Sequence, residues 1–358
     1  MDADKNPDQP HEPLGEQRLG VIQGQKRPTL KTIAEITGLA IATVSRALKD
    51  APDIGEETKK RVRGVAKDVG YRPNRAGVRL RTGKTNVICL VMSTEEHVMN
   101  HTAQLIYSVS TALRDSPYHL IITPYSSDDD PMDPIRYIVE TGSADGVIIN
   151  QLEPNDPRVK YMSEHGLPFA THGRTQMGIS HPYFDFDNER FTELGVEKLM
   201  SLGRKNLALL APPAEQTYGK QMIKGFVDAA TKHNVTFHVF ENVTSDSGMV
   251  DIQREASKII HGPNPPDAII SGSTSASIAI IAAAEEAGLK LGNELDVLTK
   301  EAVQFLRYFR KEIIIVHENV GQAGTFLVNA LMASIEKKGP HQQGLETPVL
   351  ETIDESKN

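Results

Sequence analysis

The stretch TLKTIAEITGLAIATVSRAL, residues Thr29 to Leu48, contains two short amphipathic segments on either side of Gly38. Apolar or small residues recur at helical spacing in both segments, so each has a face that can pack against the other. These positions are Leu30, Ile33, Ala34, Leu39, Val44 and Leu48. Glycine readily adopts the left-handed conformation that ends a helix abruptly. The stretch therefore predicts a helix-turn-helix.

An arginine surrounded by short side chains lies on the outward face of the second predicted helix. The residues of this face are Ile41, Ala42, Thr43, Ser45 and Arg46. Such a face can enter the major groove of DNA, where arginine can donate two parallel hydrogen bonds to guanine and apolar groups favour thymine methyl groups. The pattern favours DNA recognition, although a helix pair packed inside a larger core would have the same spacing.

The charge of the chain is divided unevenly. Residues 26–84 hold fifteen Lys and Arg against six Asp and Glu, a net charge of +9. The whole chain of 358 residues carries −8, so the remaining residues carry −17. Binding to DNA phosphates requires a basic module, and an acidic body discourages nonspecific binding elsewhere. We therefore expect nucleic-acid binding at one end of the chain.

Motifs downstream of the helix pair carry a family resemblance. The segment IGEETKKRVRGVAKDVGYRPNRAGVRLRTGKTN contains a third predicted helix at Glu56 to Val69, a YRPN turn and an RTGKT linker. Together with the helix pair, it resembles the DNA-binding headpiece of the lactose-repressor (LacI/GalR) family. Relatives usually carry serine where this chain has Ala40, so the second helix is expected to lack its N-terminal cap.

The resemblance implies DNA contacts by further residues. Thr29 would cap the first helix and contact a phosphate, and Asn74 and Arg75 are also expected to contact DNA. Residues 74–82 can form only two turns of helix, which is too short to be stable alone. In the family this is a hinge helix that orders on DNA, and Leu80 would enter the minor groove together with the same residue of its dimer mate.

Short apolar strands alternate with amphipathic helices from Val87 onward, which predicts parallel sheets. The expected strands form two series: NVICLVM, HLIITPY, DGVIIN and LPFATHG, then NLALLAP, TFHVFENV, DAIISGS and ELDVLT. Two series imply two lobes. The resemblance implies a fold like that of a type I periplasmic binding protein, so the expected fold class is α/β: an all-α helix-turn-helix headpiece plus a two-lobed, doubly wound parallel-sheet effector domain.

The expected domain boundaries follow from these changes of pattern. Residues 1–26 are rich in Pro, Gln, Asp and Glu and predict a disordered arm. The headpiece is expected at residues 27–72, the hinge helix and linker at 73–84, and the effector-binding and dimerisation domain at 85–358. Within the last, the N-lobe would comprise about 85–186 and 316–340, and the C-lobe about 187–315 plus the C-terminal segment.

Six residues are expected to line the cleft between the lobes, because ligands of such folds bind at the carboxyl ends of the strands. They are Asn150, Arg174, Met222, Ser273, Glu301 and Glu318. Asn150 closes the strand DGVIIN and offers a donor and an acceptor to a sugar hydroxyl. The resemblance implies the positions of the others, and Met222 stands where many relatives have an arginine that grips sugar hydroxyls.

These features predict a sequence-specific transcriptional regulator, a repressor of carbohydrate-utilisation genes that binds a palindromic operator as a homodimer. A small sugar-like effector in the cleft would switch it. The candidate carboxylates Glu301 and Glu318 leave a cationic or amino-bearing ligand as an alternative. Whether the effector induces or co-represses, whether the regulator activates or represses, and whether dimers pair into tetramers all stay open.

Two other functions share part of this pattern. A sugar-binding transport component has the two-lobed fold, but it would need an export signal and would lack a basic headpiece. An architectural DNA-binding protein would use the headpiece but would leave about 270 residues without a role. The start, MDADKNPDQPHEPLGEQ, has no hydrophobic signal region, and no run of 18 apolar residues occurs, so we expect a cytoplasmic protein.

Motifs for catalysis and for metal binding are weak. The tripeptide Gly83-Lys84-Thr85 lacks the earlier glycine of a phosphate-binding loop, because Val78 stands there. His97 and His101 have the spacing of a helical metal pair without an evident third ligand. The lone Cys89 lies in an apolar run and is interpreted as a buried strand residue. We expect no enzymatic activity, no metal and no cofactor.

Overall fold

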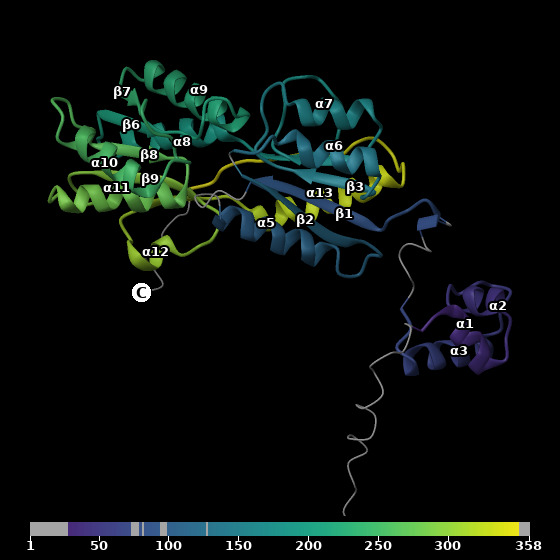
Figure 1. Cartoon of the computed structure of the whole chain (residues 1–358). Helices are drawn as coiled ribbons and strands as arrows, with labels where there is room; N and C mark the ends of the chain where they lie inside the picture. The colour runs from purple at the N-terminus through teal and green to yellow at the C-terminus, as the bar shows by residue number, and fades with distance from the viewer. Residues whose placement is uncertain (1–27, 73–78, 81, 94–98, 127, 351–358) are drawn as a thin grey trace, which may run out of the picture. The chain divides into compact units, whose positions relative to one another are not determined.

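The computed structural model describes residues 28–72, 79–80, 82–93, 99–126 and 128–350. The chain divides after Lys84 into two compact units, which are described separately below (Figure 1). The predicted arm at residues 1–26 lies outside the described residues. Among the residues that are described, no helix is both long enough and apolar enough to cross a membrane.

The first unit contains the predicted helix-turn-helix and a third helix. Its helices are α1 (Leu30–Thr37), α2 (Ile41–Ala47) and α3 (Glu56–Asp68). Thr29 caps α1, because its side chain accepts from the backbone N–H of Thr32 while the Thr32 side chain accepts from the N–H of Thr29. Gly38 ends α1 in the left-handed conformation at φ +67°. The three helices bury one core, made by Ile33, Ala34, Val44, Ala47, Val62 and Ala66.

The predicted hinge falls mostly outside the described residues. Asn74 and Arg75 belong to the undescribed segment 73–78, so their expected DNA contacts are not tested. Arg79 and Leu80 are helical, and the Leu80 side chain is 91% exposed. An apolar side chain with so little burial in its own unit is available for a contact elsewhere.

The second unit begins with a parallel sheet of strand order β11-β5-β4-β3-β1-β2. Helices cover both of its faces. The side chains of β1 alternate between the two faces. Those on one face, such as Ile88, pack toward α5 and α13, and those on the other, such as Val91, pack toward α6 and α7. The strands are β1 (Val87–Ser93), β2 (His119–Tyr125), β3 (Gly146–Ile149), β4 (Phe169–His172), β5 (Tyr183–Phe186) and β11 (Gln343–Glu346). The helices are α5 (Met99–Ala112), α6 (Met132–Thr141), α7 (Pro157–Glu164) and α13 (Val320–Ile335).

A second parallel sheet has the order β10-β9-β8-β6-β7. Helices α8 and α9 cover one face, and α10 and α11 cover the other. Each pair packs on a hydrophobic core of its own. The strands are β6 (Asn206–Leu210), β7 (Thr236–Val239), β8 (Ala268–Ser271), β9 (Asp296–Glu301) and β10 (Ile314–His317). The helices are α8 (Asn188–Ser201), α9 (Thr217–Lys232), α10 (Met249–Ile260), α11 (Thr274–Glu286) and α12 (Leu306–Phe309). Two doubly wound lobes after an all-α headpiece confirm the predicted fold class.

Three segments connect the two sheets. The chain passes from β5 into α8 near Asp187, returns from β10 into α13 near Glu318, and after β11 reaches Leu350, which forms a bridge with Val316. Because β11 lies in the first sheet, that sheet includes residues up to 346, a few beyond the predicted limit near 340. The buried thiol of Cys89 lies in β1, as expected, and burial raises its pKa.

Candidate functional site

The outward face of α2 carries the five residues predicted to read DNA. Ile41, Ala42 and Arg46 are exposed, while Thr43 and Ser45 are half-buried. The intervening Val44 and Ala47 are fully buried against the other two helices. Burial of one face leaves the other available, so the helix presents the surface that major-groove binding requires. Arg46 on this face is ion-paired with Asp53, which lies in the loop before α3.

The N-terminus of α2 has no side-chain cap, because Ala40 offers no hydrogen-bond acceptor. Replacing Ala40 with serine should stabilise the headpiece by about 1 kcal/mol, since a serine hydroxyl accepts from an unpaired N–H of the first turn. Thermal unfolding of the full chain, followed in the headpiece transition, would measure this. Thr29→Ala removes an existing cap and should shift the same transition downward. A headpiece transition that Ala40→Ser leaves unchanged would contradict the prediction.

A cavity of about 120 Å³ lies between the two sheets, and most of its lining residues, which come from both lobes, are polar. Several of these residues follow directly from strand ends: Asn150 after β3, His172 at the end of β4, and Lys300 near the end of β9. Parallel strands bring their carboxyl ends to one edge, where ligands of open α/β sheets bind. The volume is enough for several water molecules and therefore for polar ligand groups.

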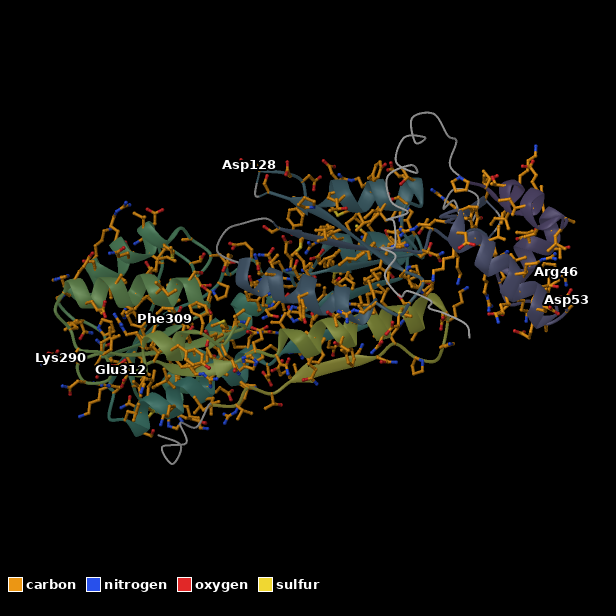
Figure 2. The ribbon with its side chains drawn as sticks, turned by 90° about the horizontal axis from the view of Figure 1, so that it is seen from below. Arg46, Asp53, Asp128, Lys290, Phe309 and Glu312 are labelled. Carbon is orange, nitrogen blue, oxygen red and sulfur yellow. The ribbon has the colours of Figure 1, made fainter. Side chains whose placement is uncertain are left out.

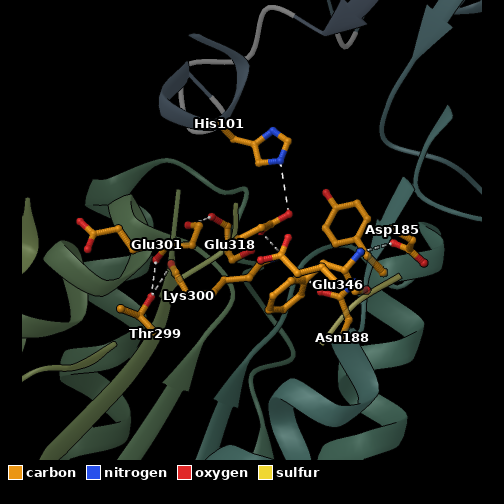
Figure 3. Close-up of polar contacts among 12 residues, drawn as sticks. His101, Asp185, Asn188, Thr299, Lys300, Glu301, Glu318 and Glu346 are labelled. Carbon is orange, nitrogen blue, oxygen red and sulfur yellow. Dashed lines mark hydrogen bonds and ion pairs between the residues drawn. The ribbon is translucent and has the colours of Figure 1, made fainter. Parts of the chain in front are cut away.

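Two ion pairs form part of the cavity wall. Lys300 Nζ lies 3.0 Å from a carboxylate oxygen of Glu318, and Arg174 Nε lies 2.5 Å from Asp185. His101 approaches Glu318 from α5 at 3.5 Å, as Figure 3 shows. Burial opposes ionisation of Glu318, but Lys300 and His101 outweigh it and hold the pKa of this carboxyl well below its usual value. Glu318 is therefore a carboxylate whose charge is already balanced.

Two buried polar atoms at the cavity have no hydrogen-bond partner among the described residues. They are Oδ1 of Asn150 and Oγ1 of Thr217. Leaving a buried polar atom unpaired costs roughly 1–3 kcal/mol, so each favours a water or ligand group beside it. The Tyr218 hydroxyl, which also lines the cavity, donates to a carboxylate oxygen of Asp246 at 3.2 Å. The wall therefore combines unsatisfied polar groups with an aromatic ring.

Four of the six predicted cleft residues line this cavity: Asn150, Arg174, Ser273 and Glu318. Arg174 is paired with Asp185, and Ser273 caps α11 while donating its hydroxyl hydrogen bond to Ser245 O at 3.0 Å. These two residues thus shape the wall while keeping their strongest interactions within the protein.

The predictions for Met222 and Glu301 are wrong in their placement. Met222 is fully buried in the core between α9 and α8 and does not line the cavity, because its position on α9 faces the neighbouring helix. Glu301 is turned away from the cavity, and its Oε1 accepts from the backbone N–H groups of Phe305 and Leu306. It fixes the loop before α12.

The sequence interpretation missed several cavity residues, including Lys300, His172 and Tyr218. Successive residues of a strand point to opposite faces. Because Glu301 faces away from the cavity, its neighbour Lys300 faces into it, so strand alternation was an available signal. Lys300 also lies 5.3 Å from the centroid of Phe186 and 5.7 Å from that of Tyr218. His172 ends the predicted strand LPFATHG, so its position at a strand end was an available signal as well.

His101, His172 and Glu318 have possible metal-ligating atoms within 4.8 Å of one another. Lys300 already neutralises Glu318 from 3.0 Å, and its charge would repel a cation at this place. We therefore interpret the three residues as a hydrogen-bonding and ion-pairing group. The other histidine of the predicted metal pair, His97, lies outside the described residues.

His172 should make the unit sensitive to acid. Burial, His101 and Lys300 lower its pKa from 6.5 to about 3. Below pH 6.5 the unfolded chain binds a proton that the folded chain excludes, so stability present above pH 6.5 is lost as pH falls toward 3. We expect the free energy of unfolding to fall by up to about 1.4 kcal/mol per pH unit between about pH 6.5 and 4.5.

Denaturant titrations of the full chain at several pH values would measure this slope. His172→Gln should flatten it, whereas His261→Gln, which changes an exposed histidine, should leave it intact. The same slope in all three proteins would show that His172 is not the responsible group.

Comparisons with known proteins agree with both parts of this arrangement. Residues 29–74 match the profile of bacterial regulatory proteins of the lacI family, and residues 196–353 match that of the periplasmic binding protein-like domain. The HTH-type transcriptional regulator RafR of Escherichia coli is 34% identical over 247 residues, which are 68% of this chain and 72% of RafR.

Solved structures agree with the fold. The lac repressor dimer bound to operator and the anti-inducer ONPF superposes with a TM-score of 0.81 at 18% identity, covering 91% of this chain and 98% of that one. A complex of the transcriptional regulator CelR with cellobiose gives a TM-score of 0.63 at 20% identity, covering 91% and 99%. The chain belongs to the LacI family of bacterial regulatory proteins and is a DNA-binding transcriptional regulator.

Proposed function

We propose that this regulator represses carbohydrate-utilisation genes, binds a palindromic operator as a homodimer, and changes its DNA affinity when a neutral carbohydrate enters the cavity. The observation that carries this proposal is a cavity with unpaired acceptors in its wall, in the same chain as an exposed recognition helix. The headpiece would contact DNA through Thr29, the α2 face, Asn74, Arg75 and Leu80.

The charges of the cavity favour a neutral ligand. The carboxylates of Glu318 and Asp185 are each paired with a cation of the wall, and Glu301 lies outside the cavity. These pairs leave Glu318 and Asp185 without the unbalanced negative charge that would attract a cationic ligand, and the third carboxylate of the wall, Asp246, accepts hydrogen bonds from Tyr218 and Ser245. Asn150 and Thr217 provide groups that can bind hydroxyls, and the rings of Phe186 and Tyr218 can cover an apolar sugar face. The solved CelR complex contains cellobiose.

The connecting segments would couple the cavity to the relative arrangement of the two lobes. Glu318 and Asn188 lie at two of the three connections between the sheets, and Lys300 contacts both. The backbone N–H of Thr217 in one lobe donates to Leu152 O in the other at 2.7 Å. A ligand that contacts both lobes would favour one relative arrangement of the sheets and so bias the hinges.

Exposed apolar side chains supply a surface for a second copy of the chain. Tyr107 of α5, Ile121 of β2, and Tyr308 and Phe309 of α12 are each at least 43% exposed. Next to Phe309, labelled in Figure 2, lies an apolar groove lined by α11 and α12. Isologous contact between such surfaces would bury them in a two-fold dimer. Two subunits would then read two half-sites.

Replacing Phe309, which is 69% exposed, with glutamate should shift the chain from dimer toward monomer, because a carboxylate would be buried in the interface. We expect at least a tenfold weaker dimer in sedimentation equilibrium, on the order of 1.4 kcal/mol or more. Val250→Glu, which replaces another exposed apolar residue on α10, is the matched control. Equal dimer affinity in both variants would place the interface elsewhere.

The proposed function can be tested in two steps. The full chain is first used to select binding sites from a random duplex library, and a palindromic motif is expected. A panel of neutral mono-, di- and trisaccharides is then screened by thermal shift, with Asn150→Leu as the variant expected to lose the response. Without an enriched motif, the transport-type alternative is favoured. A motif without any carbohydrate response would favour the architectural alternative.

A further inference from the structure

We infer that Asp53 is a specificity-determining residue of the headpiece, which positions the Arg46 guanidinium for guanine. This inference rests on the proposed recognition of DNA by α2. The carboxylate of Asp53 is ion-paired with Nη2 of Arg46, and the two side chains lie together in Figure 2. They are 58% and 45% exposed, so the pair remains accessible to a DNA duplex.

The loop that carries Asp53 is tied to the backbone of Arg46. The carbonyl oxygen of Arg46 accepts hydrogen bonds from the N–H groups of Lys49 and Ala51, each at 3.1 Å. Further along, the N–H of Ile54 donates to Ala51 O, and its side chain packs against the headpiece core. Because the loop is fixed on both sides of Asp53, its carboxylate is held beside the recognition helix.

Neither affinity nor stability accounts for a carboxylate at this place. A negative charge beside DNA repels phosphates and weakens binding to every sequence. An exposed ion pair adds little to folding stability. The carboxylate of the other acidic residue of the loop, Asp50, is ion-paired with Lys59 and Arg63 of α3 instead of with a residue of α2. Specificity is the property that Asp53 can supply.

The geometry of arginine explains how Asp53 can raise the specificity of base recognition. A guanidinium has five N–H donors in a rigid plane, and recognition of guanine uses two parallel ones. Asp53 pairs with Nη2 of Arg46, so the other N–H donors of the guanidinium remain for the base. An arginine held in one plane matches the O6 and N7 acceptors of guanine, whereas an unrestrained arginine can turn to a phosphate instead. Fixing Arg46 therefore raises discrimination at the cost of general affinity.

The test compares Asp53→Asn with Asp50→Asn in the full chain. Both variants remove one negative charge from the same loop, but only Asp53 contacts Arg46. Asparagine tolerates the left-handed backbone of Asp50, at φ +57°, so the control should fold. Dissociation constants are measured for the duplex that the wild type selects, for versions with each guanine pair replaced in turn, and for an unrelated duplex.

Both variants should bind the unrelated duplex more tightly than the wild type. The variant Arg46→Met identifies the guanine that the arginine contacts. At this guanine, only Asp53→Asn should lose discrimination between guanine and its replacement, by about five- to tenfold. Unchanged discrimination in Asp53→Asn would show that Asp53 merely repels phosphates, and sharper discrimination would show that it restrains Arg46 from binding. Either result overturns the inference. A wild type that selects no motif would instead overturn the proposed DNA recognition on which it rests.

Discussion

Replacing Arg158 with methionine should destabilise the two-lobed unit by about 3–5 kcal/mol, because it leaves the buried carboxylate of Asp156 without a counter-ion. The two side chains are 4% and 1% exposed and form a two-pronged pair, with N–O distances of 3.0 and 2.7 Å. Arg158 also donates to the carbonyl oxygens of Asn150 and Gln151, at 3.2 and 2.8 Å. Removing it therefore frees the loop that carries Asn150 into the cavity.

Denaturant unfolding of the full chain would measure this loss of stability. Two further variants would show whether it comes from the unpaired buried charge. Arg190→Met breaks pairs of Arg190 with two glutamates that are 41% exposed, and should cost less than about 1 kcal/mol. Asp156→Asn in the Arg158→Met background should restore part of the stability, because it removes the buried charge. A loss in Arg158→Met no larger than in Arg190→Met would contradict the account of a desolvated pair.

Replacing Arg46 with methionine should have the largest effect on operator binding. One guanine contact discriminates by about 1–3 kcal/mol, and a dimer would lose two such contacts. The selected duplex should therefore bind roughly 30-fold to 10⁴-fold more weakly, while binding to unrelated duplexes falls far less. Fluorescence anisotropy with both duplexes would give this ratio.

Lys31→Met is the matched control, since it also removes one exposed positive charge from the headpiece. It should weaken binding to all duplexes by a similar factor and preserve their ratio, as expected for a phosphate-directed charge. If Arg46→Met also preserved the ratio, Arg46 would not read a base.

The elements of this fold could be predicted where local sequence determines them. The headpiece follows from apolar spacing and from Gly38, whose left-handed backbone ends α1. The strands of both sheets follow from apolar runs such as VICLVM, all of which is buried in β1. Asn150 could be placed in the cavity because it ends a buried strand, and strand ends meet at one edge.

The orientation of individual side chains could not be predicted in the same way. Position in a family motif placed Met222 and Glu301 on the correct segments, but neighbouring elements decide which way each side chain turns. His101 and Lys300 meet at Glu318, although His101 lies about 200 residues before the other two in the sequence. Only the tertiary fold reveals this contact. The pairing of Asp53 with Arg46 likewise depends on the path of a loop.

If one chain couples DNA recognition to a neutral carbohydrate, the carbohydrate must change the affinity for DNA. An anisotropy titration of the selected duplex with the full chain, with and without a saturating carbohydrate from the thermal-shift screen, measures this change. We expect at least a fivefold change in DNA affinity, and the same factor in carbohydrate affinity when DNA is present, because coupling between binding sites is reciprocal. A carbohydrate that binds the cavity but leaves DNA affinity unchanged would show that the two sites are not coupled.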